Sequence, residues 1–249
     1  LDVGRIEAVL AAPETATRMT SLRRELAGTR VILSVERLDY TKGTLEKIHA
    51  FERLLDEHPE LIGKISLLTV CVPAAKEMTV YDELQTRIEQ AVGRVNGRFA
   101  RVGWTPVQFF FRPLPFEEVV AWYAMADVMW ITPLRDGLNL VAKEYAATQG
   151  LTGGHGVLVL SEFAGAAAEL HGAVLTNPHD IHDLTAKLYF GIAMNRAEAE
   201  SRLRELFDVV RHNDIARWGQ EFLDAVQAPA PDATPAPASH LKLVDQPAA

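Results

Sequence analysis

A chain of 249 residues is long enough for one large α/β domain or two small ones. Its composition, 48% hydrophobic and 23% charged, is ordinary for a globular protein. The net charge of −8 argues against a nucleic-acid partner, and no apolar stretch approaches the roughly 18 residues of a membrane span. A single cysteine, Cys71, excludes an internal disulfide and lies in an apolar run, which favours a buried thiol and a cytoplasmic location.

Helix and strand patterns alternate along most of the chain. Residues 1–28 carry apolar positions at helical spacing and are expected to form a helical lead-in. The start at Leu1 rather than Met indicates a fragment that lacks its natural start. Strands are predicted at 31–35, 65–72, 107–111, 128–131, 157–160 and 173–175. Helices are predicted after Gly43, at 80–95, 116–125 and 140–148, and through 180–226.

This alternation is typical of a Rossmann-like α/β fold, a parallel sheet with helices on both faces. We expect residues 29–227 to form one such domain. Residues 228–249 are rich in Pro and Ala and poor in large apolar side chains. Such a composition buries too little surface to order itself, so it predicts a disordered tail.

The stretch after the fourth predicted strand combines a tight turn with the start of a helix. Pro133 ends that strand because it has no N–H for the sheet ladder. Asp136 and Gly137 are typical turn residues, and nothing breaks a helix from Leu140 to Thr148. Open α/β sheets bind ligands at the carboxyl ends of strands, and the free N–H groups that open a helix favour an anion such as a diphosphate. We therefore expect a ligand site at this strand-to-helix turn.

A second loop, between the first predicted strand and Gly43, carries Arg37 and Lys42. Arg offers a planar fork and Lys a compact charge, and both suit a diphosphate. The alternative is a solvated basic loop, which short charge patterns usually indicate. Because this loop lies at a strand's carboxyl end before a helix, the two interpretations are about equally favoured.

Two acidic residues accompany the turn and the helix. Asp136 would point at a substrate beside the helix start, and Glu144, inside the helix, could reach a ribose diol. The alternatives are an N-terminal cap for Asp136 and a solvated helix face for Glu144. The neighbouring Gly137, Asn139 and Lys143 favour the ligand-binding interpretation.

Three other patterns are less specific. Residues 161–165 (Ser-Glu-Phe-Ala-Gly) follow a strand, and they suit a ligand turn or close helix–sheet packing equally. His179 and His182 lack the clustering of a metal site, so neither a metal nor a cofactor is expected. Gly93, Gly97 and Gly103 are interpreted as a loop and hairpin, and not as a dinucleotide fingerprint.

Several long motifs occur in one order along the chain, at residues 34–43, 93–97, 103–106, 132–145 and 159–165. Together they resemble the trehalose-6-phosphate synthase family of retaining glycosyltransferases, which includes glucosylglycerol-phosphate synthase. The resemblance runs from about Val31 to Leu223. It implies two Rossmann-like domains in the GT-B arrangement, of which this chain matches only the C-terminal, donor-binding one. The missing N-terminal domain would supply most of the acceptor pocket and a catalytically important histidine.

The resemblance also implies roles for the two loops. Arg37 and Lys42 would hold the donor diphosphate, and Asp136 would contact the hydroxyls of the transferred glucose. These three are the expected catalytic residues. Further donor-binding residues are implied at Gly137, Leu138, Asn139, Leu140, Val141 and Glu144, with backbone N–H groups from Leu140 and Val141 and a ribose contact from Glu144. No protein nucleophile is evident, which agrees with the front-face mechanism proposed for the family.

The segment after the second predicted strand bears on the acceptor. Trehalose-type enzymes usually carry an Arg there that grips glucose 6-phosphate, whereas an ungapped count from Arg37 places Ala75 at that position, beside Lys76. Residues 74–81, residues 130–133 and Leu138 are instead similar to glucosylglycerol-phosphate synthases. We therefore expect transfer of glucose from ADP-glucose to glycerol 3-phosphate, for compatible-solute synthesis. The alternatives are trehalose 6-phosphate synthesis from UDP-glucose and glucose 6-phosphate, and a non-catalytic nucleotide-sugar-binding module.

Overall fold

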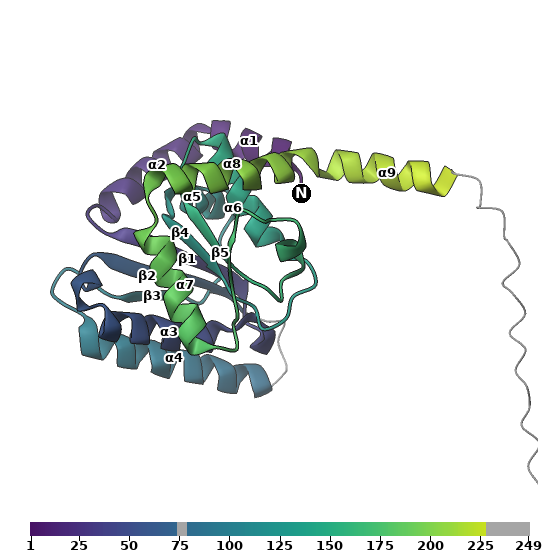
Figure 1. Ribbon diagram of the computed structural model, residues 1–249. Helices are drawn as coiled ribbons and strands as arrows, with labels where there is room; N and C mark the ends of the chain where they lie inside the picture. The colour runs from purple at the N-terminus through teal and green to yellow at the C-terminus, as the bar shows by residue number, and fades with distance from the viewer. Residues whose placement is uncertain (74–78, 228–249) are drawn as a thin grey trace, which may run out of the picture.

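The computed structural model describes residues 1–73 and 79–227, and its centre is a six-stranded sheet (Figure 1). The strands are β1 (Arg30–Arg37), β2 (Ile65–Val72), β3 (Val107–Phe110), β4 (Val128–Ile131), β5 (Val157–Ser161) and β6 (Val174–Thr176). Their order is β3-β2-β1-β4-β5-β6, and every pairing is parallel. The predicted Rossmann-like fold is thus confirmed. The strand order reverses between β1 and β4, and sheets of this kind bind ligands beside such a reversal, at the carboxyl ends of the strands.

Helices cover both faces of the sheet. One layer holds α3 (Thr44–Glu57), α4 (Thr79–Phe99) and α7 (Ile181–Ala193); the other holds α1 (Val3–Ala11), α2 (Pro13–Glu25), α5 (Phe116–Met125), α6 (Leu140–Leu151) and α8 (Arg196–His212). Neighbouring residues of β1 show why two layers form. Leu33 packs in the core beneath α5 and α6, whereas Ile32 packs in the core beneath α3 and α7. Since successive side chains of a strand point to opposite faces, a continuous apolar run needs cover on both.

The helices expected in residues 1–28 are α1 and α2, which pack against α5 and α6. Ile6 and Leu22 are buried in that layer at 0% and 1% exposure. Gly28 follows α2 with a φ of 83°, as expected for a glycine just past a helix end. The division into a lead-in at 1–28 and a nucleotide-sugar-binding domain at 29–227 stays a prediction. The predicted tail, 228–249, lies outside the described residues.

The interpretation of Gly93 and Gly97 as part of a loop is wrong. Both lie within α4, and Gly103 alone of the three glycines occupies a turn, with a φ of 82°. A glycine inside a helix costs about 1 kcal/mol relative to alanine, which is less than the burial of one large apolar side chain contributes. Because α4 buries an apolar side against the sheet layer and pairs Arg94 with Glu52 of α3 at 2.7 Å, it continues through both glycines.

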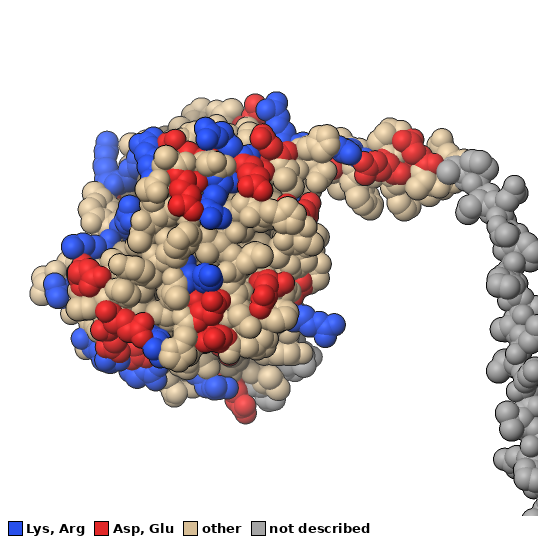
Figure 2. All heavy atoms as spheres, viewed as in Figure 1, with Lys and Arg blue, Asp and Glu red and all other residues tan. Residues whose placement is uncertain are grey.

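The last helix, α9 (Ile215–Gln227), projects from the body of the protein (Figures 1 and 2). None of its residues is buried, and its exposed apolar side chains include Trp218, Phe222, Leu223 and Val226. Over the face of the body seen in Figure 2, Lys and Arg are mixed with Asp and Glu. Within the described ranges, no helix combines the length and the apolar character that a membrane crossing requires.

Two glycines allow three loops to meet at the carboxyl edge of the sheet. At Gly43, where φ is 67°, an added Cβ would lie 2.6 Å from the carbonyl oxygen of Thr132. At Gly165 an added Cβ would lie 2.1 Å from the carbonyl oxygen of Gly137. Both distances are too short for a real Cβ contact, so the loops after β1, β4 and β5 approach this closely only with glycine at these positions.

We expect Gly165→Ala to lower the free energy of unfolding by about 1–3 kcal/mol, the usual cost of overpacking, because the backbone at Gly137 must move. Gly137→Ala is the matched control, since its added Cβ would meet no heavy atom within 4 Å. Urea unfolding of both variants measures the difference. Equal stabilities would contradict the close approach of the two loops.

Candidate functional site

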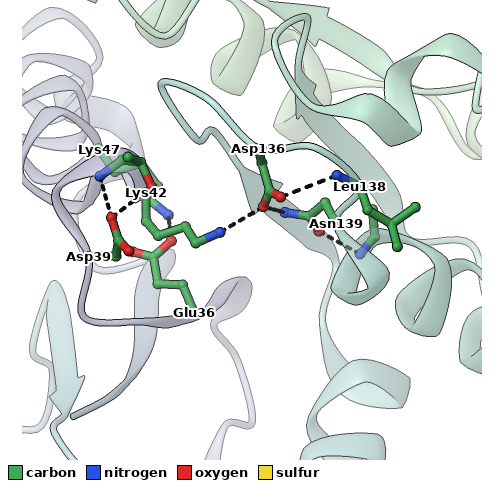
Figure 3. Close-up of polar contacts among 9 residues, drawn as sticks. Glu36, Asp39, Lys42, Lys47, Asp136, Leu138 and Asn139 are labelled. Atoms are coloured by element: carbon green, nitrogen blue, oxygen red, sulfur yellow. Dashed lines mark hydrogen bonds and ion pairs between the residues drawn. The ribbon is translucent and has the colours of Figure 1, made fainter. Parts of the chain in front are cut away.

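An ion pair joins the two loops that meet where the strand order reverses. Lys42 ends a short 3₁₀ turn (Tyr40–Lys42) after β1, and Asp136 lies in the loop between β4 and α6. The Lys42 Nζ lies 2.7 Å from the Asp136 Oδ2, and the two side chains are 17% and 16% exposed (Figure 3). Partial burial limits screening by water and salt, so this contact is stronger than a surface pair. Two residues predicted from separate loops are thus brought together.

The Asp136 carboxylate accepts further hydrogen bonds from its own loop. The Leu138 N–H donates at 3.3 Å and the Asn139 Nδ2 donates at 3.1 Å (Figure 3). Burial raises the pKa of Asp136, but the hydrogen bond and charge of Lys42, with the bonds from Leu138 and Asn139, lower the pKa overall. Asp136 is therefore ionised at neutral pH, and its carboxylate can accept hydrogen bonds.

Asn139, not Asp136, caps α6. The Asn139 Oδ1 accepts from the Ala142 N–H at 3.1 Å, so the alternative role of Asp136 as the cap is wrong. Among the described residues, Asn139 is the only non-glycine residue with a positive φ, at 73°. Backbone strain of this kind clusters at ligand sites. The N–H groups of Leu140 and Val141 open the helix, where geometry gives them no intrahelical acceptor and makes them available to an anion.

Glu144 lies inside α6 and is half-buried. The Tyr123 hydroxyl, from α5, donates to the Glu144 Oε2 at 3.0 Å. Burial raises the pKa of Glu144, while the Tyr123 hydrogen bond and the charge of Arg5 partly offset that rise. The alternative of a solvated helix face is therefore wrong. With Leu138 and Leu140, Glu144 lines a cavity of about 560 Å³, within the range of small-molecule sites.

The other predicted residues are not drawn into this pair. Arg37 is the exposed last residue of β1 and forms no ion pair with the described residues, so its contact with a diphosphate stays a prediction. Ala75 and Lys76, which bear on the acceptor, lie outside the described residues. In the part of the chain that the structure describes, no three His, Cys, Asp or Glu side chains are grouped to hold a metal, at His179 and His182 or elsewhere.

The segment 161–165 contacts the Asp136 loop through its backbone. The Gly165 N–H donates to the Asp136 carbonyl oxygen at 2.9 Å, and the Ala166 N–H donates to the Leu138 carbonyl oxygen at 2.8 Å. These bonds join two loops and not a helix to the sheet, so both interpretations of this segment stay predictions. The contact holds the Asp136 loop in place from the β5 side.

A buried ion pair that the sequence did not predict supports the Lys42 loop. The Lys47 Nζ, from α3, contacts the Glu36 carboxylate of β1 (Figure 3), and the two side chains are 2% and 8% exposed. Lys47 also donates to the Ser34 Oγ at 2.6 Å, and the Thr44 Oγ1 donates to Glu36. These bonds tie the end of β1 to the first turn of α3 and so close the loop that carries Lys42. A signal was present, because Lys47 falls on the apolar side of its helix, where a charge needs a partner.

We expect Lys47→Met to lower the free energy of unfolding by about 3–5 kcal/mol, because it leaves the Glu36 charge buried without a partner. The double variant Glu36→Leu/Lys47→Met should recover most of that loss, since no buried charge remains. Arg53→Met is the control on the same helix: it removes the Arg53–Glu57 pair, whose side chains are 34% and 42% exposed, and should cost less than about 1 kcal/mol. Chemical unfolding compares the three. A Lys47→Met chain of native stability would refute this role for the pair.

The chain is similar in sequence to known glycosyltransferases. The model of glycosyltransferase family 20 matches residues 1–228. The chain is 72% identical to the glucosylglycerol-phosphate synthase of Pseudomonas anguilliseptica, over 92% of this chain and 30% of that protein. It is 39% identical to the UDP-forming alpha,alpha-trehalose-phosphate synthase of Schizosaccharomyces pombe, over 91% of this chain and 44% of that protein.

A solved structure shares the fold as well. The UDP-forming alpha,alpha-trehalose-phosphate synthase of Burkholderia xenovorans, in complex with glucose-6-phosphate, superposes with a TM-score of 0.85 at 36% identity. That likeness covers 92% of this chain and 50% of the solved chain, as expected for one of two domains. The chain thus spans between 30% and 50% of the length of these relatives. Since the family match runs from the start of the chain to the end of α9, the chain belongs to glycosyltransferase family 20, as its motifs predicted.

Proposed function

We propose that the chain is the donor-binding half of a retaining glucosyltransferase, which transfers glucose from a nucleotide sugar to glycerol 3-phosphate and gives glucosylglycerol phosphate. The observation that carries this proposal is the Lys42–Asp136 pair, an ammonium and a carboxylate 2.7 Å apart before the N-terminus of α6. A nucleotide sugar presents the complementary groups, two phosphates and a ring of hydroxyls. The 72% identity to a glucosylglycerol-phosphate synthase supports this reaction within the family.

In this proposal the nucleotide-sugar donor contacts both Lys42 and Asp136. Lys42, with Arg37, turns to the diphosphate, while Asp136 accepts hydrogen bonds from the glucose hydroxyls. When the bond between the anomeric carbon and the phosphate oxygen breaks, negative charge builds on the departing diphosphate. Lys42 and the N–H groups of Leu140 and Val141 stabilise that charge more strongly than the ground state. The acceptor hydroxyl bonds to the anomeric carbon on the same face and gives its proton to the departing phosphate.

We propose ADP-glucose as the donor. Two further glucosylglycerol-phosphate synthases are 43% and 41% identical to the chain, whereas the trehalose-phosphate synthases compared with it are 36–39% identical. The test is an assay of the full-length enzyme with ADP-glucose or UDP-glucose, each with glycerol 3-phosphate or glucose 6-phosphate. We expect glucosylglycerol phosphate, formed fastest from ADP-glucose. Trehalose 6-phosphate as the main product would show that glycerol 3-phosphate is not the acceptor. Binding of a nucleotide sugar without turnover would show that the protein is a binding module and not an enzyme.

The partner of this chain, in our proposal, is the N-terminal half of the same enzyme, which brings the phosphorylated acceptor. Trp218 and Phe222 of α9 are 61% and 54% exposed, although the family match includes this helix. Adjacent exposed aromatic residues are typical of a surface that another part of the protein covers.

We also propose the cytoplasm as the compartment, because it keeps a free thiol such as Cys71 reduced.

In the full-length enzyme we expect Lys42→Ala to lower kcat/KM about 30- to 1,000-fold, which corresponds to about 2–4 kcal/mol of transition-state stabilisation. The reason is the loss of a preorganised positive charge where the leaving group develops negative charge. Lys64→Ala is the matched control, because Lys64 is exposed and precedes β2 at the opposite edge of the sheet. Steady-state kinetics compare the two variants. Native turnover and donor affinity in Lys42→Ala would rule out this role.

A further inference from the structure

Tyr123 is a buried residue of α5 whose hydroxyl reaches the candidate site. Its side chain is 0% exposed, and the hydroxyl donates to the Glu144 Oε2 at 3.0 Å. Burial, with a further effect of the Glu144 carboxylate, raises the pKa of Tyr123 well above its usual range. The hydroxyl is therefore a permanent donor. It occupies one carboxylate oxygen and leaves the Oε1 without a hydrogen bond to the described residues.

Glu144 stands among several charged groups. Those that line the cavity with it are Asp2, Arg5, Lys143 and Asp214. Burial is the largest effect on the pKa of Glu144 and raises it, whereas the Tyr123 hydrogen bond and the Arg5 guanidinium act in the opposite direction. Lys143 is paired with Glu169. Within the described chain, Tyr123 is the residue that donates a hydrogen bond to the Glu144 carboxylate.

We propose that Tyr123 is a positioning residue, which holds the Glu144 carboxylate so that its second oxygen accepts the hydroxyls of a ribose. The site then selects ribonucleotide donors over deoxyribonucleotide donors. This inference rests on the proposed function, which makes the ligand a nucleotide sugar. A carboxylate that is already oriented loses little side-chain freedom when the ribose binds. Without the hydroxyl, the Oε2 lacks its donor, and the carboxylate is free to turn toward another donor.

Tyr145 offers a matched control for Tyr123. It is also 0% exposed, and its hydroxyl donates to the Ala126 carbonyl oxygen at 3.2 Å. Its ring packs edge-on against that of Tyr123, with the ring centroids 6.4 Å apart. Tyr145→Phe therefore removes an equally buried hydroxyl from the same part of the fold, while the Tyr123–Glu144 hydrogen bond stays in place.

Calorimetric titration of the full-length enzyme with ADP, 2′-deoxy-ADP and 3′-deoxy-ADP tests the proposal; the uridine series replaces them if UDP binds more tightly. We expect the wild type to bind the ribonucleotide about tenfold more tightly than at least one deoxy form, as for a hydrogen bond to a charged group. Tyr123→Phe should lose that tenfold preference and bind the deoxy forms as the wild type does. Tyr145→Phe should keep every affinity.

The pH dependence of affinity gives a readout that a merely structural role would not move. Affinity for the ribonucleotide falls as protonation of Glu144 removes the acceptor. Since the Tyr123 hydrogen bond lowers the pKa of Glu144, Tyr123→Phe should move this fall to higher pH, and Tyr145→Phe should not. Tyr123→Leu, which also lacks the hydroxyl, serves the same comparison if Tyr123→Phe does not fold.

The outcomes separate this inference from the function on which it rests. Equal losses for ribonucleotide and deoxyribonucleotide in Tyr123→Phe, or the same behaviour in Tyr145→Phe, would overturn the role of Tyr123 and leave the proposed function intact. Nucleotide binding without any preference for ribose in the wild type would do the same. An enzyme that binds none of these nucleotides would overturn the proposed function and the inference together.

Discussion

The ion pair between Lys42 and Asp136 is the contact on which the site depends. It joins the loops after β1 and β4 at the reversal of strand order, where α3 leaves for one face of the sheet and α6 for the other. Ligands of open α/β sheets bind beside such a reversal. Opposite charges held 2.7 Å apart offset each other. A simple anion that paired with Lys42 would leave the Asp136 carboxylate without its cation. A ligand with both phosphates and hydroxyls gives Lys42 an anion and gives Asp136 hydrogen-bond donors, so this pair favours ligands that carry both groups.

Two contacts hold the loops of Lys42 and Asp136 in place: a buried ion pair and a backbone hydrogen bond. Lys47 and Glu36 fasten the loop of Lys42 to α3, and the backbone of Gly165 holds the loop of Asp136 from the β5 side. Neither support includes the side chain of Lys42 or of Asp136. Groups that are positioned before a ligand arrives need little reorganisation as charge develops, which is how electrostatic stabilisation lowers a barrier. The two supports therefore position the Lys42–Asp136 pair, although neither is part of it.

The sequence predicted what depends on local pattern. The apolar run that ends before Pro133 predicted β4 and the position of the loop after it. The alternation of strands and helices predicted the parallel sheet. What escaped prediction depends on contacts between distant parts of the chain. The partner of Lys47 lies on a strand, and α4 continues through Gly93 because burial outweighs the local cost of glycine. The left-handed backbone of Asn139 is likewise imposed by the closure of its loop.

Asp136 and Glu144 lie on one loop-and-helix segment, yet their surroundings move their pKa values in opposite directions. The lowered pKa of Asp136 favours folding above its unfolded-state pKa, and that contribution is lost as the pH falls. The raised pKa of Glu144 does the reverse: it favours folding at low pH and disfavours it as the carboxylate ionises. A glutamine at this position would accept the Tyr123 hydrogen bond without that cost. The proposed ribose contact of Glu144 accounts for a carboxylate at this cost, because an ionised acceptor binds a pair of hydroxyls more strongly than a neutral amide does.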